Sequence, residues 1–412
     1  MKFNVDAKLF SAMLATAAAH STRNAASIGG FFRIKAEGDS ITIGASCQIS
    51  DFEGKILADI VEPGDVAVVA DKLQAIASLI STSTVETLEV GTTSTGKLSL
   101  KDADNKMKGF KAILRTLSAE KFPKFPECPE NKWGKIDAEL LANAISHISP
   151  IADKGNEQLE IRKAFHIEQN VRTNDETGEE ETVLTFVATN GRSLGTESYV
   201  IDSEDAIPEF VSANLPAAFM NRILSVIGRE AKDAIKVGFA FHEGRVFVRT
   251  ETSIMAMSLF NDKYCAWNRV IPQDTPETPL KWAEVNEKEL YQALSIIAVA
   301  TDEKTRKITF EFSDNKIDMY GANTDGDEVE QSVEAQVSDV NIKMGINKDL
   351  IIPCLKGLEA AKASAVNPIK IGLRNDKSAI VIRRMDNVGP LYVVMPMEGS
   401  FAEKTEDDSS GL

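Results

Sequence analysis

The sequence predicts an α+β fold built from three tandem copies of one unit. One short segment recurs three times, and in each copy a helical pattern and then alternating strand patterns follow it. The recurring segments are residues 5–10, 136–141 and 285–290. We expect each unit to pack two helices on antiparallel sheet, because amphipathic helices and one-sided sheets bury their apolar faces against each other.

The first helix of each unit opens with an Asp or Asn, at Asp6, Asp137 and Asn286. Such side chains cap a helix by accepting hydrogen bonds from its first backbone N–H groups. Apolar residues then recur at helical spacing, so each helix should bury one face. They are Leu9, Phe10, Met13, Leu14 and Ala17, then Leu140, Leu141, Ala144, Ile145 and Ile148, then Leu290, Ala293, Leu294 and Ile297.

Strands and a second helix complete each unit. The second helices are predicted over 72–80, 215–229 and 347–363, with Pro216 in a first helical turn and Pro353 delaying or kinking its helix. Alternating apolar residues predict the strands. The strand segments are 31–36, 40–45 and 97–114, then 182–188, 193–200 and 235–260, then 307–312, 316–321 and 369–397.

Proline-rich segments divide the chain. Residues 121–130 and 270–280 each carry three prolines and read as extended linkers. We therefore expect domains at 1–125, 126–275 and 276–397, followed by an acidic tail at 398–412 that stays solvated. Residues 169–181 are acidic and read as a disordered segment or a hairpin.

Composition restricts the class of protein. The 412 residues are too many for one ordinary core, and we find no run that could span a bilayer and no secretion signal. Four cysteines without close spacing predict free thiols in a reducing, cytoplasmic setting. The net charge of −16 speaks against a protein that coats nucleic acid, although it allows a local basic face.

Chemical motifs are weak throughout. Residues 91–98 resemble a phosphate-binding loop, but Leu98 replaces the metal-binding hydroxyl and the alternation predicts a hairpin. Residues 323–328 resemble a calcium loop, but Glu328 replaces the required glycine, which favours a solvated loop. The histidines lack metal spacing, and no catalytic constellation is present. We expect neither a metal nor a cofactor, and no enzyme.

Three short segments carry a resemblance to a known family. They are residues 187–194 (VATNGRSL), 268–272 (NRVIP) and 392–397 (YVVMPM). In this order they resemble the bacterial-type beta sliding clamp, the processivity subunit of replicative DNA polymerase. The resemblance extends from Met1 to about Met397 in the order of elements, and the last motif is the most specific. The weak match elsewhere indicates a divergent member, for which we hypothesise a phage or plasmid origin.

The resemblance implies three clamp-type units in a head-to-tail homodimeric ring around duplex DNA. It also implies contacts to the replicative DNA polymerase and to a clamp-loader ATPase, which dock peptides in a pocket between domains 2 and 3. For that pocket it implies Thr189, Gly191, Arg192, Leu194, Arg269, Val270, Asn347, Val393, Val394, Met395, Pro396 and Met397. The candidate DNA contacts are Lys8, Arg23, Lys72, Arg222, Arg229, Lys356 and Lys362, and the implied dimer joint joins Ile76, Ile80 and Phe110 to Val299 and Ala300.

Other readings of these residues stay open. Residues 391–397 could be an ordinary core strand, the dimer residues could be core, and each cation could be a solvated side chain. The sequence also departs from the family. Asp71, Ala217 and Ala218 stand at positions that are usually basic. Cys265 stands where the family has a pocket proline, and Ser193 stands where the family often has arginine. Two rival functions follow, a monomeric decoy that titrates clamp-binding proteins and an enzyme that uses the loop at 91–98.

Removal of residues 398–412 is expected to strengthen peptide binding, because an acidic tail leaving the edge of the predicted pocket would screen it. Titrating one fluorescent partner peptide into the full chain and into the truncated chain measures the difference. Equal affinities would contradict the screening hypothesis.

Overall fold

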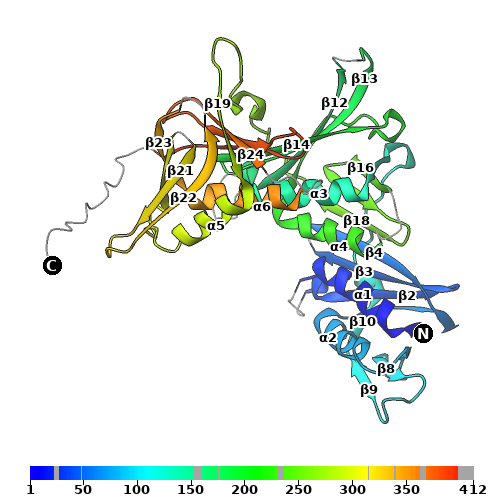
Figure 1. Ribbon diagram of the computed structural model, residues 1–412. Helices are drawn as coiled ribbons and strands as arrows, with labels where there is room; N and C mark the ends of the chain where they lie inside the picture. The colour runs from blue at the N-terminus through cyan, green and yellow to red at the C-terminus, as the bar shows by residue number, and fades with distance from the viewer. Residues whose placement is uncertain are drawn as a thin grey trace, which may run out of the picture. The chain divides into compact units, whose positions relative to one another are not determined.

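The computed structural model describes residues 1–22, 27–47, 49–152, 160–174, 177–230, 236–313, 315–337, 340–361 and 368–397 (Figure 1). The predicted tail at 398–412 lies outside these residues. The chain divides into two compact units. Unit 1 contains Met1–Ala142, Ile201–Phe210 and Phe219–Leu259, and unit 2 contains Asn143–Val200, Val211–Ala218 and Phe260–Leu412.

Unit 1 holds a five-stranded sheet in the order β5-β1-β7-β8-β9 and a nine-stranded sheet in the order β10-β6-β2-β3-β4-β18-β17-β16-β11. Its helix α1 contacts both α2 and α4. The helices are α1 (Ala7–Ala19), α2 (Ala70–Ser81) and α4 (Met220–Glu230). The strands are β1 (Lys2–Asp6), β2 (Phe31–Glu37), β3 (Ser40–Cys47), β4 (Ser50–Leu57), β5 (Asp59–Glu62), β6 (Gly64–Val69), β7 (Thr87–Thr92), β8 (Leu98–Asp102), β9 (Lys111–Leu114), β10 (Thr116–Ser118), β11 (Gly134–Asp137), β16 (Lys236–His242), β17 (Arg245–Arg249) and β18 (Ser253–Ser258).

Unit 2 holds one twelve-stranded sheet in the order β15-β12-β13-β14-β26-β25-β24-β19-β22-β21-β20-β23. Its helices α5 and α6 pack against each other (Figure 1). They are α5 (Glu287–Ile297) and α6 (Lys348–Ala360), while α3 (Ala138–Ile148) contains the boundary of the two units. The strands are β12 (Ala164–Thr173), β13 (Glu180–Thr189), β14 (Ser193–Ile201), β15 (Ser212–Pro216), β19 (Lys281–Asn286), β20 (Lys307–Ser313), β21 (Lys316–Ala322), β22 (Glu328–Val337), β23 (Ile342–Asn347), β24 (Pro368–Leu373), β25 (Ile380–Arg384) and β26 (Leu391–Val394).

The threefold repeat is visible in the strand orders. Each repeat has one sheet of the type β1-β7-β8-β9, which recurs as β11-β16-β17-β18 and β19-β24-β25-β26. Each also has one of the type β6-β2-β3-β4, which recurs as β15-β12-β13-β14 and β23-β20-β21-β22. The predicted α+β fold of three tandem units is therefore confirmed.

Strand pairing also joins neighbouring repeats. The strand β4 pairs with β18, and β14 pairs with β26, both antiparallel. For this reason the two compact units cut across the three predicted domains, whose borders at 125 and 275 stay a prediction.

The predicted helix caps are confirmed. The Asp6 carboxylate accepts from the backbone N–H of Lys8 (2.9 Å) and Leu9 (2.8 Å). Asn286 caps α5 in the same way, and Asp137 accepts from Leu140 N–H at 2.9 Å. The buried stripes follow the prediction except at Leu140, which is half-buried, and at Leu9, which is 55% exposed because it lies at the edge of the buried face of α1.

One prediction about proline was wrong, and for Pro353 the expected delay is absent while the expected kink stays a prediction. The helix expected from residue 215 starts at Met220, because Leu215 and Pro216 end strand β15, where Pro216 lies opposite Ala164 of β12. Pro353 does not delay its helix, since α6 begins directly after the capping side chain of Asn347 and continues through Pro353.

The rejected motifs have ordinary structures. Residues 91–98 form the predicted β7–β8 hairpin, with Gly96 at a φ of 77° in its turn. In the turn at 323–327, the Asn323 side-chain oxygen accepts from Asp325 and Asp327 N–H. The segment 169–181 belongs to the β12–β13 hairpin, apart from residues 175–176, which lie outside the described chain. All four cysteines are free thiols.

One buried contact fixes the middle of unit 2. Tyr392 on β26 is fully buried, and its hydroxyl donates to the backbone carbonyl of His147 at 2.9 Å. Gly357 on α6 leaves room for that hydroxyl, because a Cβ there would lie 1.8 Å from Tyr392 Oη and 2.9 Å from His147 O. Beside it, His147 Nδ1 lies 2.8 Å from the buried Glu197 carboxylate.

Gly357→Ala is expected to destabilise the chain by about 2 to 4 kcal/mol, because the added methyl displaces the Tyr392 ring and breaks its hydrogen bond. Gly228→Ala is the matched control. Gly228 also lies in a helix, but nothing lies within 4 Å of an added Cβ. That variant should gain roughly 0.5 to 1 kcal/mol. Urea unfolding followed by circular dichroism measures both, and equal effects would refute the packing argument.

Candidate functional site

The candidate site is a cavity of about 310 Å³ in unit 2. Its walls come from four segments that are far apart in the sequence: the end of β13 with the start of β14, the 3-10 turn at Glu160–Lys163, the segment 265–270, and β26. The lining residues are Ile161, Arg162, Thr189, Gly191, Arg192, Ser193, Leu194, Cys265, Val270, Val393 and Met395.

The turn between β13 and β14 is held by its own polar groups. The Thr189 hydroxyl donates to Ser193 O (2.7 Å) and accepts from Gly191 N–H (3.0 Å). The Asn190 side-chain oxygen accepts from Arg192 and Ser193 N–H at 2.9 and 2.8 Å. Gly191 has a φ of 85°, a conformation that favours glycine. These bonds fix the shape of one cavity wall.

Strand alternation decides which residues of β26 reach the cavity. Val393 lies opposite Leu194 of β14, and both line the cavity. Tyr392 and Val394 alternate with Val393 and are fully buried on the other face. After the strand ends, Met395 N–H donates to Arg192 O at 2.9 Å, which holds Met395 at the rim.

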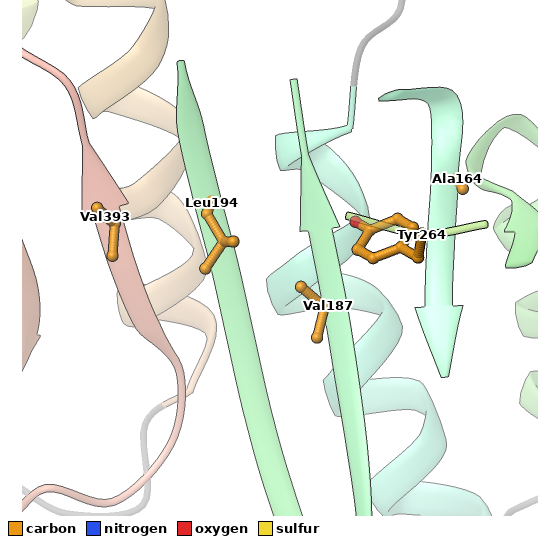
Figure 2. Close-up of a cluster of buried hydrophobic side chains, with 5 residues drawn as sticks. All are labelled: Ala164, Val187, Leu194, Tyr264 and Val393. Atoms are coloured by element: carbon orange, nitrogen blue, oxygen red, sulfur yellow. The ribbon is translucent and has the colours of Figure 1, made fainter. Parts of the chain in front are cut away.

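A buried apolar cluster supports the cavity. Figure 2 shows Val393, Leu194, Val187 and Ala164 on the adjacent strands β26, β14, β13 and β12, with the Tyr264 ring close to Ala164. Ile161, Trp267 and Leu391 pack against it. The cavity therefore lies on a rigid apolar layer, as a pre-formed binding site requires.

Polar contacts hold the segment that carries Cys265. The Tyr264 ring stacks on His166 at a centroid distance of 4.2 Å, and His166 Nδ1 lies 2.6 Å from Asn214 Oδ1. Trp267 Nε1 donates to Glu168 Oε2 at 3.3 Å. The hydrogen bond with His166 lowers the pKa of Glu168, so this carboxylate stays ionised and keeps both partners.

The electrostatics of the cavity differ from those of the whole chain. Arg162 and Arg192 line it, and no carboxylate does among the residues that the structure describes there. Burial raises the pKa of the Cys265 thiol, which therefore stays protonated at neutral pH. An acidic protein thus presents an apolar cavity with a basic rim.

The structure brings together seven of the twelve residues implied for the pocket: Thr189, Gly191, Arg192, Leu194, Val270, Val393 and Met395. The other five lie elsewhere. Asn347 caps α6, and the Val394 side chain is buried on the face of β26 away from the cavity. Arg269 is exposed outside the cavity. Pro396 and Met397 do not line the cavity either, and Met397 N–H donates to the backbone carbonyl of Gly345. The predicted set did not include Ile161 or Arg162, which follow no motif, and it named Ser193 and Cys265 only as departures from the family.

Five of the seven candidate DNA contacts lie on helices of the described chain. Lys8 on α1, Lys72 on α2 and Lys356 on α6 are exposed. Arg222 on α4 is half-buried, where its guanidinium lies 4.2 Å from the Phe219 ring and donates to Cys47 Sγ. Arg23, Lys362 and the side chain of Arg229 lie outside the described residues.

The implied dimer residues differ in exposure. Ile80 and Ala300 are 3% and 4% exposed and pack inside their own units, whereas Ile76 and Phe110 are half-buried and Val299 is 85% exposed. Exposed apolar neighbours that the prediction missed are Leu79, Ile113 and Ile296.

The sequence predicts no metal site, because its histidines lack metal-ligand spacing and residues 323–328 lack the glycine of a calcium loop. Among the described residues, no group of three or more His, Cys, Asp or Glu side chains could hold a metal ion. In the same part of the chain, we find no helix with the length and apolarity needed to cross a membrane.

Known proteins resemble this chain over most of its length. Residues 268–398 match the family described as DNA polymerase III beta subunit, C-terminal domain. The beta sliding clamp of Pseudomonas aeruginosa is 21% identical over 365 residues, which is 88% of this chain and 89% of that protein. The beta sliding clamp of Treponema pallidum is 21% identical over 366 residues, which is 89% of this chain and 90% of that protein.

Solved structures share the fold. The DNA polymerase III subunit beta from Pseudomonas aeruginosa superposes with a TM-score of 0.80 at 20% identity, over 96% of this chain and all of that one. The beta subunit from Thermotoga maritima superposes with a TM-score of 0.81 at 18% identity, over 97% of this chain and 100% of that one. The phage or plasmid origin stays a hypothesis. The family match, the relatives and the fold agree, and over most of its length this chain is similar to the beta sliding clamps.

Proposed function

We propose that two copies of this chain form a closed ring that encircles duplex DNA and tethers the replicative DNA polymerase for processive synthesis. The observation that carries the proposal is the way in which the repeats join. At each junction inside the chain, a strand of one repeat pairs with a strand of the next repeat. The strand β4, which ends the order β6-β2-β3-β4, pairs with β18, which ends the order β11-β16-β17-β18. In the same way β14, which ends β15-β12-β13-β14, pairs with β26, which ends β19-β24-β25-β26.

This pairing between repeats leaves one strand edge unpaired in the first repeat and one in the third. The strand β9 ends the five-stranded sheet, and β22 pairs only with β21 and, through Ala335–Val337 of its ten residues, with β19 in the described sheets. Unpaired strand edges invite pairing with another chain. A second copy placed head to tail supplies β9 to β22 twice, which closes a two-fold ring.

Charge and apolar surface support this joint. The strand β22 carries Glu328, Glu330 and Glu334, while Lys111 lies on β9 and Lys108 just before it. Exposed apolar side chains accompany both ends: Leu79 and Ile113 in unit 1, and Ile296 and Val299 in unit 2. Opposite charges set the register of such a joint, and the apolar groups lose their contact with water.

A closed ring stays on DNA by topology and needs only weak, sequence-independent phosphate contacts, which permit sliding. Exposed Lys8, Lys72 and Lys356 on the helices are suited to that role. The net charge of −16 repels DNA from the remaining surface. The clamp is non-catalytic and cytoplasmic, and a clamp-loader ATPase opens it.

The cavity of unit 2 binds short peptides of the polymerase and the loader. Its apolar walls accept the apolar side chains, and Arg162 and Arg192 at the rim attract flanking acidic residues. The unused strand edges argue against the monomeric decoy, which would leave both edges open.

The wild-type chain is expected to have a solution mass near twice 44.9 kDa and to remain on circular but not on linear DNA after loading. Val299→Asp should yield monomers, because it places a charge in the apolar part of the joint. Multi-angle light scattering across a dilution series measures the mass. Val211→Asp is the control, since Val211 is also exposed (68%) but directly precedes β15, at the end of the twelve-stranded sheet opposite to β22, β21, β20 and β23.

A wild-type monomer at micromolar concentration that also fails to remain on circular DNA would refute the ring. A mass of three chains would refute the two-fold closure.

Met395→Asp is expected to lower the affinity for a partner peptide at least tenfold, because it puts a carboxylate on the apolar wall. Met395 is 45% exposed, so the fold should tolerate the change. Val388→Asp, on an exposed loop residue of the same unit, should bind normally. Fluorescence anisotropy with a labelled polymerase peptide measures both, and unchanged binding by Met395→Asp would place the peptide site elsewhere.

A further inference from the structure

One arginine of the third repeat lacks the carboxylate partner that its equivalent in the second repeat has. Strand pairing makes two rows of the repeated sheet equivalent: Gly134–Phe239–Val248 in the second repeat and Ala283–Ile371–Ile382 in the third. A tryptophan precedes the first member of each row, and an arginine follows the last. Trp133 therefore corresponds to Trp282, and Arg249 corresponds to Arg383.

In the second repeat, the chain itself neutralises this arginine. The Arg249 guanidinium lies 4.1 Å from the ring centroid of Trp133. It donates to both carboxylate oxygens of Glu130, at 2.8 and 3.2 Å. Glu130 stands three residues before Trp133. The second repeat thus supplies its own bidentate carboxylate, which is the strongest form of ion pair that arginine makes.

The third repeat keeps the aromatic ring but not the carboxylate. Pro279 stands three residues before Trp282, where the second repeat has its glutamate. In addition, Lys370 lies directly opposite Arg383 on the neighbouring strand, with its Nζ 4.8 Å from the Trp282 ring centroid. Burial and, after it, the charge of Arg383 lower the pKa of Lys370. Like charges that face each other across two strands are destabilising.

The carboxylates nearby do not compensate these two cations. Among the residues that the structure describes, neither Lys370 nor Arg383 forms an ion pair. Asp274 accepts hydrogen bonds from its own loop and the strand that follows, and Asp386 accepts one within its own turn. Glu284 lies opposite Lys370 on β19, on the side away from Arg383. An anion from outside the chain could therefore meet both cations.

We propose that Lys370 and Arg383, on the sheet face outside the cavity, bind an acidic segment of the partner protein whose apolar motif occupies the cavity. This inference rests on the proposed peptide-binding function. A carboxylate of the partner would meet Arg383 in the way in which Glu130 meets Arg249 in the second repeat.

The strand register places this surface within reach of the cavity. Val393 lines the cavity and pairs with Val381 of β25, which lies two residues before Arg383 on the same sheet face. One strand spacing and two residues of strand amount to roughly 8 Å. About three extended residues span that distance. An acidic residue close to the apolar motif in the partner sequence can therefore reach Arg383.

The test uses a fluorescent peptide, selected from a randomised library, that binds the wild-type chain but not Met395→Asp. Either end is extended by Gly-Gly-Glu-Glu-Glu or, for comparison, by Gly-Gly-Gln-Gln-Gln. At one end, the glutamate form should bind the wild type about fivefold more tightly than the glutamine form at low salt. The advantage should vanish on Lys370→Gln/Arg383→Gln. It should persist on Lys288→Gln/Lys304→Gln, the matched control, which removes two exposed lysines of the same unit.

Thermal unfolding separates this role from a structural one. Arg249→Gln removes a bidentate ion pair and should lower the melting temperature. Arg383→Gln removes a cation that faces Lys370 and has no ion-pair partner in the described chain, so it should lower the melting temperature less. Equal falls would give Arg383 a structural role and overturn the inference.

The binding data can overturn the inference in three further ways. Equal affinities of the glutamate and glutamine forms, or an advantage that survives on Lys370→Gln/Arg383→Gln, would refute it while the peptide site stands. If no library peptide distinguishes the wild type from Met395→Asp, the proposed peptide function fails, and the inference fails with it. If Lys370→Gln/Arg383→Gln instead loses affinity for a fluorescent oligothymidylate, the surface belongs to a nucleic acid.

Discussion

The hydrogen bond from Tyr392 to the His147 carbonyl, made across Gly357, is the constraint on which unit 2 depends. It ties β26 to the end of α3, 245 residues earlier in the sequence, at a place where α6 leaves room for the hydroxyl. Because Tyr392 is fixed on one face of β26, strand alternation fixes Val393 on the other. The cavity therefore obtains its central wall from a residue whose position the core determines. The adjacent His147–Glu197 pair adds a second buried polar contact at the same place.

The joint between the repeats is the second constraint. The backbone bonds of β4 with β18 and of β14 with β26 make continuous sheets out of separate repeats. Backbone pairing specifies direction and register but little of the side chains, so repeats can diverge in sequence while they keep the joint. This explains how a chain 20% identical to a solved clamp still superposes over nearly its whole length.

Local signals in the sequence were sufficient for the repeat. Asp6, Asp137 and Asn286 mark the first helices by a chemistry that acts within three residues, and the apolar stripes follow helical spacing. The predicted start of α4 was wrong because proline is acceptable both at the end of a strand and in the first turn of a helix. In the cavity, the motif residues of β14 and β26 were found, whereas Ile161 and Arg162 were not. They come from segments without periodicity, and only the paired strands bring them to the wall.

The junction rule has a consequence for the evolution of ring size. Both junctions inside the chain use the same two strand positions, and the proposed closure uses them again, so the chemistry of closure does not depend on how many repeats the ring contains. A gene duplication that added one repeat, or a deletion that removed one, would leave compatible ends. The number of repeats in a closed assembly is then set by the angle between neighbours, a property of side-chain packing at the joint. Selection could thus alter the circumference through a few packing residues while the backbone pairing stays as it is.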